Sequence, residues 1–283
     1  MCRSIALFIA IFAGALGTNA QTPTSTPSPQ PSPTPSLERQ FFKNILEDQR
    51  AIWTSPLQLH GEDAKWLVPL GLSTAALIAT DRRTAGALHD NRLRLNISRD
   101  IGYLGSGFGA GSIAGSIYLI GRARGDAHLR ETGLLAAEAL IDDLAVFPVI
   151  KVVTERTRPR KDQARGRFFH GGFSFPSGHA MSAWTLATVI GDEYKERRLV
   201  RFGVYGLAVL VSASRFTGRN HFLSDVLVGG AIGYGIGHYV YRTHNDPRLG
   251  KTTTDSHSKL LPLIAPRFER RSQSYGIWLA WEF

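Results

Sequence analysis

The 283-residue chain is long enough for one large domain or two small ones, and its hydrophobic content of 43% excludes general disorder. Its formal net charge of +10 points to a nucleic acid or another anionic surface. Half of that excess lies in residues 151–175, where seven Lys/Arg stand against Glu155 and Asp162. Such a basic run is a solvated loop, a membrane-surface patch or the mouth of an anion-binding site.

The N-terminal part of the chain carries signals for export rather than for folding. Residues 1–20 combine Arg3, an apolar core and small residues before residue 21, which predicts a signal peptide. The one cysteine, Cys2, lies inside this segment, so the chain without it has neither disulfides nor a cysteine nucleophile. Residues 21–36 are rich in Pro, Ser and Thr and predict an extended linker.

The remainder predicts an all-α domain flanked by two smaller pieces. Residues 37–60 form an amphipathic helix and a turn, with Leu37, Phe41 and Ile45 on one face and the charges elsewhere. Residues 61–245 contain six helical segments, at about 65–80, 101–121, 131–153, 177–193, 199–213 and 221–241. The tail, residues 246–283, ends in a period-two alternation that predicts a short β-hairpin.

Three short motifs carry the chemistry. They are Lys151-x6-Arg158-Pro159, Phe175-Pro176-Ser177-Gly178-His179 and Ser214-Arg215-x5-His221-x3-Asp225. Each has an ordinary structural explanation when it is taken alone: a helix stop, a helix N-cap, and an exposed His–Asp pair on a helix. A helix that begins at Ser177, however, also points free N–H groups outward and suits a phosphate.

Together and at these spacings, the three motifs resemble the signature of the type 2 phosphatidic acid phosphatase (PAP2) superfamily. That superfamily also contains the bacterial class A acid phosphatases and the vanadium haloperoxidases. The resemblance covers roughly residues 65–242 and implies a six-helix PAP2-type bundle. It also implies a metal-independent phosphatase without a cofactor.

The resemblance implies a role for each signature residue. His221 is the nucleophile that forms a phosphohistidine, and Asp225, four residues later, holds its other ring nitrogen. His179 is the general acid for the leaving alcohol and then the base for water. The phosphate-binding groups are Lys151, Arg158, Ser177, Gly178 and Arg215. Lys151 and Arg158 are seven positions apart in the sequence, which predicts that both project from one face of a helix.

Several alternatives remain open at this stage. The favoured substrates are phosphomonoesters or pyrophosphates that are lipid-linked, of the phosphatidate, polyprenyl pyrophosphate or lipid A type. The alternatives are a soluble periplasmic non-specific acid phosphatase, a vanadium-dependent haloperoxidase, and a catalytically silent envelope protein. We expect no metal and no nucleic-acid partner, and the sequence gives no indication of oligomeric state.

The expected location is the cell envelope, with a membrane-bound domain whose active site faces the periplasm, or else a soluble periplasmic domain. Three acidic residues argue against simple membrane helices, because Glu138, Asp142 and Asp143 lie in an otherwise apolar segment. Six spans after a cleaved signal would also place the active site in the cytoplasm. Either one helix therefore does not span, or the domain is peripheral.

Overall fold

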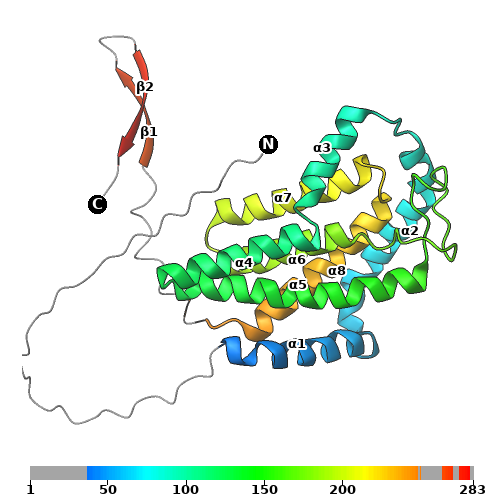
Figure 1. Ribbon diagram of the computed structural model, residues 1–283, viewed down its shortest axis with the longest axis horizontal. Helices are drawn as coiled ribbons and strands as arrows, with labels where there is room; N and C mark the ends of the chain where they lie inside the picture. Colours follow the sequence, from blue (N-terminus) through cyan, green and yellow to red (C-terminus); the bar gives the residue numbers. More distant parts are fainter. Residues whose placement is uncertain (1–36, 248, 250–262, 270–273, 281–283) are drawn as a thin grey trace, which may run out of the picture. The chain divides into compact units, whose positions relative to one another are not determined.

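The computed structural model describes residues 37–247, 249, 263–269 and 274–280 (Figure 1). The predicted signal peptide and linker, residues 1–36, lie outside this range. The helices are α1 (Leu37–Thr54), α2 (Ala64–Gly86), α3 (Arg92–Tyr103), α4 (Gly107–Arg124), α5 (Ala127–Thr154), α6 (Gly178–Glu193), α7 (Arg198–Thr217) and α8 (Leu223–His244). Short 3-10 helices at Ser55–Leu57 and Gly61–Asp63 connect α1 to α2.

Side-chain caps fix where four of these helices begin. Asn91, Ser106, Asp126 and Ser177 stand at the N-caps of α3, α4, α5 and α6, and each side chain accepts a hydrogen bond from a backbone N–H of the first turn. Such caps satisfy N–H groups that have no partner inside the helix. The boundaries of α3 to α6 are therefore encoded locally.

The core of the bundle is centred on α6. This helix packs against α8, α7 and α5, while α4 packs on α5, α3 on α7, and both α1 and α2 contact α8 (Figure 1). Its inward side chains join those of α5 and α8 in one apolar cluster that includes Leu135, Leu140, Met181, Val189 and Val240. Burial of this kind is the main favourable term in folding.

Glycines let α8 approach α6 at backbone distance. A Cβ placed on Gly229 would lie 2.6 Å from the carbonyl oxygen of Ser177, and one on Gly233 would lie 2.2 Å from that of Met181. Any larger residue would force the two helices apart. The first turn of α6 and the start of α8 are held together as a result.

The helix count differs from the six segments expected in residues 61–245, since α2 to α8 make seven α-helices there. The additional helix is α3, which is short and charged, with Arg92, Arg94, Arg99 and Asp100. A search for apolar residues at helical spacing misses such a helix, because its buried positions are the small residues Ser98 and Gly102. The predicted second segment is thereby divided between α3 and α4.

Two strands follow the helices, β1 (Leu263–Glu269) and β2 (Ser274–Ala280), which pair antiparallel from Leu263 opposite Ala280 to Glu269 opposite Ser274. The predicted C-terminal hairpin stays a prediction for the tail as a whole, because residues 250–262, 270–273 and 281–283 lie outside the described residues.

The inward face of α1 also differs from the expectation. Its fully buried side chains are Asn44 and Asp48, whereas Phe42 and Leu46 are exposed. The predicted apolar positions Phe41 and Ile45 are only partly buried. Polar groups on α5 and α8 receive Asn44 and Asp48, which a pattern of apolar residues does not reveal.

Candidate active site

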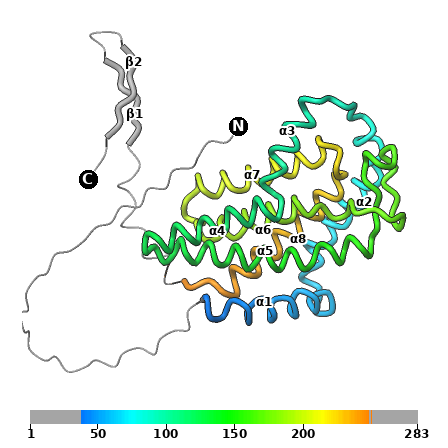
Figure 2. Tube along the Cα trace, in the orientation of Figure 1, coloured from blue at the N-terminus to red at the C-terminus, as the bar shows by residue number. Residues whose placement is uncertain are grey.

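The three motifs meet at the end of the bundle where α5 ends and α6 and α8 begin (Figure 2). Backbone hydrogen bonds tie them together: the Ser177 N–H donates to the carbonyl oxygen of Asp225 at 3.0 Å. The Lys151 ammonium donates to the carbonyl oxygen of Phe173, also at 3.0 Å. The loop of residues 155–177 thus connects α5, α6 and α8 in one site.

His221 is held in one tautomer. Its Nδ1 lies 2.7 Å from the carbonyl oxygen of Ser174, an atom that can only accept, so Nδ1 carries the proton. The other ring nitrogen, Nε2, is then left with a lone pair. Burial lowers the pKa of His221, which favours the neutral ring. A neutral imidazole with a free Nε2 has the form that a nucleophile requires.

Asp225 does not hold the His221 ring nitrogen directly, although the resemblance implies that it does. His221 precedes α8, and its Nδ1 lies 3.7 Å from Oδ2 of Asp225, beyond hydrogen-bond reach. That carboxylate oxygen instead accepts from the Ser174 hydroxyl at 2.6 Å and from the Phe222 N–H at 2.8 Å. Asp225 therefore fixes Ser174, whose carbonyl in turn orients the imidazole.

The buried guanidinium of Arg156 anchors Asp225. Its Nη1 lies 2.6 Å from Oδ1 of Asp225 and its Nη2 lies 2.9 Å from Oδ2 of Asp81 on α2. The Ser224 hydroxyl accepts from the same Nη1 at 2.6 Å and donates to Oδ2 of Asp81. Arg156 is 1% exposed and lies between the rings of Phe168 and Phe222. One member of the basic run thus faces inward rather than the mouth of the site.

Lys151 and Arg158 do reach one site, but not from one helical face. The α5 helix ends at Thr154, where Glu155 adopts a left-handed conformation with φ 43°, so Arg158 lies in the following loop. The expectation of two turns of one helix was wrong for this reason. Burial, and then the charge of Arg158, lower the pKa of Lys151 to about 8, which reports how close the cations lie.

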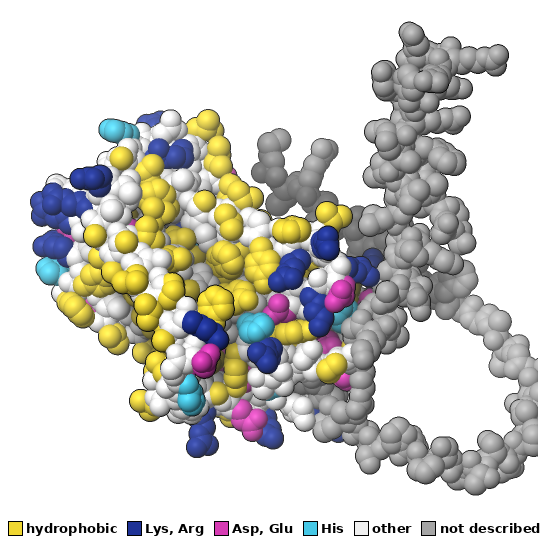
Figure 3. Space-filling view, turned by 180° about the vertical axis from the view of Figure 1, so that it is seen from behind, with side chains coloured by type: hydrophobic (Ala, Val, Ile, Leu, Met, Phe, Trp, Pro, Cys, Tyr) yellow, Lys and Arg dark blue, Asp and Glu magenta, His cyan; other side chains and the backbone are white. Residues whose placement is uncertain are grey.

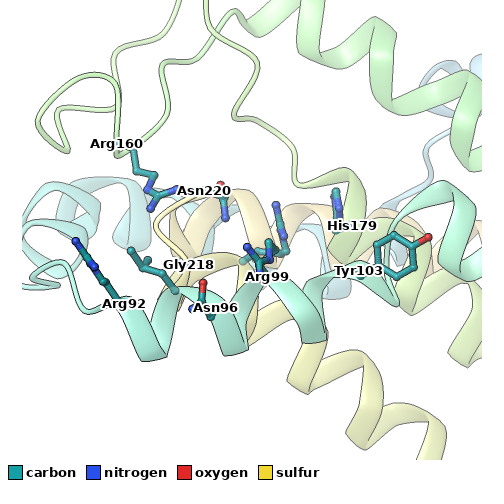
Figure 4. Close-up of a pocket in the computed structure, with 10 residues that line it drawn as sticks. Arg92, Asn96, Arg99, Tyr103, Arg160, His179, Gly218 and Asn220 are labelled. Carbon is teal, nitrogen blue, oxygen red and sulfur yellow. The ribbon is translucent and has the colours of Figure 1, made fainter. Parts of the chain in front are cut away.

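A cavity of about 570 Å³ reaches two of the predicted site residues, His179 and Arg215, while Lys151, Arg158 and His221 are not among its lining residues (Figure 4). His179 and Arg215 line it, and α3 supplies much of the opposite wall. The lining contains no acidic residue among those described; it consists of Arg92, Leu95, Asn96, Arg99, Tyr103, Arg160, His179, Arg215, Gly218 and Asn220. An anionic ligand is the natural occupant of such a cavity.

Arg215 stands in the last turn of α7 and packs against α3. A Cβ on Gly102 would lie 2.5 Å from its Nη1, so a larger residue at this position would displace the guanidinium. The carbonyl of His179 is approached equally closely by Gly105, at 2.5 Å from an added Cβ. The turn between α3 and α4 therefore packs directly on two of the predicted site residues.

His179 lies in the first turn of α6, one residue after Gly178. Burial, followed by the charges of Arg215, His221, Lys151 and Arg158, lowers its pKa to about 3. These four charged groups therefore lie near enough to His179 to affect its ionisation. A bound phosphate would reverse the effect, because its negative charge stabilises the imidazolium.

Ser177 is both a cap and a candidate ligand. Its side chain accepts from the Ala180 N–H and is fully buried at the N-cap of α6. Ser177 is therefore the helix N-cap that its sequence context predicts, and this role does not exclude phosphate binding. The N-terminus of α6, with Gly178 at its first position, adds free N–H groups and the positive end of the helix dipole to the cations.

Sequence reasoning missed the α3 wall, the inward role of Arg156, and Asp81. A signal for α3 is present: Arg92, Asn96, Arg99 and Tyr103 recur at helical spacing and line one cavity. No comparable signal exists for Asp81, because its partner Arg156 is 75 residues away in the chain.

The fold and site define a helical protein with a cationic, histidine-bearing pocket. The model of the PAP2 superfamily matches residues 132–248, which include every predicted site residue. Over these residues the chain is similar to the PAP2 superfamily.

Comparison with solved structures gives a transmembrane PAP2-type phosphatidylglycerolphosphate phosphatase from Bacillus subtilis. It is 23% identical, with a TM-score of 0.44, over 72% of this chain and 93% of that chain. No curated protein sequence gives a match.

The buried Arg156 pair generates a stability prediction. Arg156→Met keeps much of the side-chain length but leaves the carboxylates of Asp225 and Asp81 buried without their cation. We expect the free energy of unfolding to fall by about 3–5 kcal/mol. Denaturant titration followed by circular dichroism measures this loss.

The matched control is Arg167→Met, whose ion pair with Asp162 has a half-exposed guanidinium. We expect it to cost about 1 kcal/mol or less. Asp81→Asn added to Arg156→Met removes one unpaired charge and is expected to recover part of the loss. Equal losses for the Arg156 and Arg167 variants would contradict the anchoring role of Arg156.

Proposed function

We propose that the protein is a metal-independent phosphatase that hydrolyses lipid-linked phosphomonoesters or pyrophosphates through a phosphohistidine at His221. The observation that carries this proposal is the His221 ring, whose Nδ1 is committed to the carbonyl of Ser174 and whose Nε2 is left to attack. The cationic cavity beside it supplies the phosphate site.

In the proposed reaction the charges of Lys151, Arg158 and Arg215 neutralise the phosphate oxygens, with the Ser177 hydroxyl and the Gly178 N–H completing the cradle. Nε2 of His221 attacks phosphorus in line with the leaving oxygen. His179 gives its proton to that oxygen as the P–O bond breaks. Water, deprotonated by His179, then attacks phosphorus and releases His221 and inorganic phosphate.

The low pKa of His179 shapes the first step. In the free protein this ring is neutral above about pH 3, so the proton for the leaving oxygen has to arrive with the substrate. A phosphomonoester monoanion carries one. Transfer of that proton to His179 leaves a dianion among the cations and an imidazolium next to the leaving group, which is favourable for both charges.

Membrane association and a lipid substrate are supported by exposed apolar side chains. Figure 3 shows them over a broad part of one face, and those with more than half of their surface exposed include Trp66, Leu72, Phe108, Val152, Leu199 and Phe202. Apolar area of this extent marks an interaction surface. Among the described helices, α7 is long and apolar enough to cross a membrane, with a mean hydropathy of 1.4.

Exposed apolar residues also lie on the elements that carry site residues. Phe169 and Phe173 belong to the 155–177 loop, and Leu93 and Ile97 of α3 line a separate cavity. A basic mouth with an apolar rim suits a phosphate that carries acyl or prenyl chains. We propose that the domain is membrane-bound with its active site facing the periplasm; a soluble periplasmic acid phosphatase is the alternative.

Trapping the intermediate tests the nucleophile. With a ³²P-labelled substrate and acid-free quenching, wild-type protein is expected to form an acid-labile phosphoenzyme, and His221→Ala is expected to form none. His179→Ala should still label with a substrate whose leaving group needs no proton, though its turnover falls by about 10²–10⁴-fold with alkyl phosphates.

The control is His170→Ala, a histidine of the same loop whose Nδ1 lies 2.6 Å from the carbonyl oxygen of Phe168. We expect it to label like the wild type. Equal labelling of wild type and His221→Ala would place the nucleophile elsewhere.

The pH dependence tests the source of the proton. We expect kcat/KM to fall as pH rises through the second pKa of the substrate, near 6 for a phosphomonoester, because the monoanion disappears. It should also fall at acidic pH as His221 becomes protonated, below the usual histidine value of about 6.5, since its pKa is lowered.

Two alkyl phosphates whose second pKa values differ by about one unit make this test specific. The alkaline limb is expected to move with the substrate. An alkaline limb at the same pH for both would assign it to a group on the protein instead.

The lipid assignment is tested with a matched pair that shares the reacting monoester: a short-chain phosphatidate in detergent micelles and glycerol 3-phosphate. Contacts of the acyl chains with the apolar rim are expected to raise kcat/KM by about tenfold or more, as burial of two methylene groups would. Initial rates of phosphate release give both constants. A higher value for glycerol 3-phosphate would favour the soluble acid-phosphatase alternative.

A further inference from the structure

A second group of buried titratable side chains lies where α1, α5 and α8 meet. Asp48 comes from α1, Glu138 and Asp142 from α5, and His244 from the last turn of α8. The carboxylates of Asp48 and Asp142 are fully buried, and Glu138 is 1% exposed. His244 stands at the far end of α8 from His221, about 30 Å along the helix axis.

The geometry of the group is that of converging ligands. The His244 Nε2 lies 2.9 and 3.0 Å from the two carboxylate oxygens of Asp48 and 3.2 Å from Oε1 of Glu138. One ligand atom from each of these three residues lies within 4.8 Å of the others. Neighbouring ligands at bond lengths of about 2.1 Å stand about 3.0 Å apart around an octahedral ion, so these separations fit a metal as well as hydrogen bonds.

The charge of the group favours a cation. Among the described residues, the ion pairs of Asp48 and Glu138 go to His244 alone, and Asp142 has none. A protonated His244 carries one positive charge against three carboxylates. Buried charge of this kind requires compensation, either by bound protons or by a metal ion.

The hydrogen bonds of Glu138 and Asp142 favour a bound metal ion over bound protons. The outer oxygens are held by amides: Asn44 donates to Oε2 of Glu138 at 3.4 Å and Gln49 donates to Oδ1 of Asp142 at 2.8 Å. Of the other two oxygens, which are buried, Oε1 of Glu138 faces Nε2 of His244 at 3.2 Å without a hydrogen bond, and Oδ2 of Asp142 accepts none from a described residue. Amides that orient carboxylates from outside while the inner oxygens lack hydrogen bonds are typical of metal sites.

We propose that Asp48, Glu138, Asp142 and His244 bind a divalent transition-metal ion of the Mn²⁺ or Zn²⁺ class that fixes α1 to α5 and α8. Three carboxylates with one imidazole suit such an ion better than they suit the thiolate-seeking metals. The role is structural, because the site is remote from His221.

Electrostatics are consistent with a site that exchanges protons for a metal. Burial raises the pKa of Glu138 to about 8 and that of Asp142 to about 7, so both retain protons near neutral pH when no ion is bound. The Tyr239 phenol is a further titratable group near Asp48, and burial raises its pKa too. Metal binding displaces the protons from the ligands.

The test uses the purified full-length chain, stripped with a chelator and dialysed. Mn²⁺ or Zn²⁺ at about 100 times its Kd is expected to raise the melting temperature by about 5–10 °C. Elemental analysis after dialysis against the metal should find the ion retained. A melting temperature that neither ion changes would overturn the proposal.

Adjacent residues of α5 provide the matched variants. Asp142→Asn is expected to lose the metal-dependent shift, yet to melt in chelator close to the temperature of the wild type, because the amide replaces a buried carboxyl group that is largely protonated there. Asp143→Asn changes the next residue, whose carboxylate accepts from Ser182 rather than facing this group, and should keep the shift. His244→Gln, like Asp142→Asn, is expected to lose the metal-dependent shift in melting temperature.

A shift that persists in Asp142→Asn and His244→Gln would place the metal elsewhere and overturn the proposal. The outcome is independent of the phosphatase mechanism. Assayed below its melting temperature, the chelated protein is expected to keep its kcat/KM. Activity lost there and restored by Mg²⁺ would count against the metal-independent mechanism and not against this site.

Discussion

The active-site end of the bundle depends on one buried cation. Arg156 leaves the end of α5, passes between two aromatic rings and binds acids from α2 and α8 at once. Without it, Asp225 would be an unpaired charge in the interior, and Asp225 is the residue that holds Ser174, whose carbonyl faces His221. The orientation of the His221 ring therefore depends on a buried network of contacts behind it.

The catalytic signature could be predicted from the sequence because its residues sit at helix ends. Ser177 caps α6, Arg215 lies in the last turn of α7, and Asp225 lies in the first turn of α8. Helix ends have local signals in the chain, and they are where backbone groups and dipoles are free to meet a phosphate. Most helices were located for the same reason, with errors of a few residues at their ends.

What could not be predicted depends on partners that are distant in the sequence. Asp48 reads as an exposed charge on an amphipathic helix until α8 brings His244 to it from 196 residues away. The apolar pattern of α5 marks Glu138 and Asp142 as anomalies but does not name what they face. The sequence predicted Arg158 to lie on a helix because the left-handed residue that ends α5 is Glu155 and not glycine, the usual sequence signal for a helix end.

The two ends of the bundle bury ionisable groups of opposite kind. At one end Lys151, Arg158 and Arg215 are held close enough for burial and mutual repulsion to lower the pKa of Lys151 to about 8. At the other, the carboxyl groups of Asp48 and Glu138 converge with the imidazole of His244. In the proposals made above, a phosphate binds at the first end and a metal ion at the second, and each ligand stabilises the folded protein. Since α5 and α8 contribute to both ends, the metal would stabilise the same two helices that must hold the phosphate site against its own repulsion.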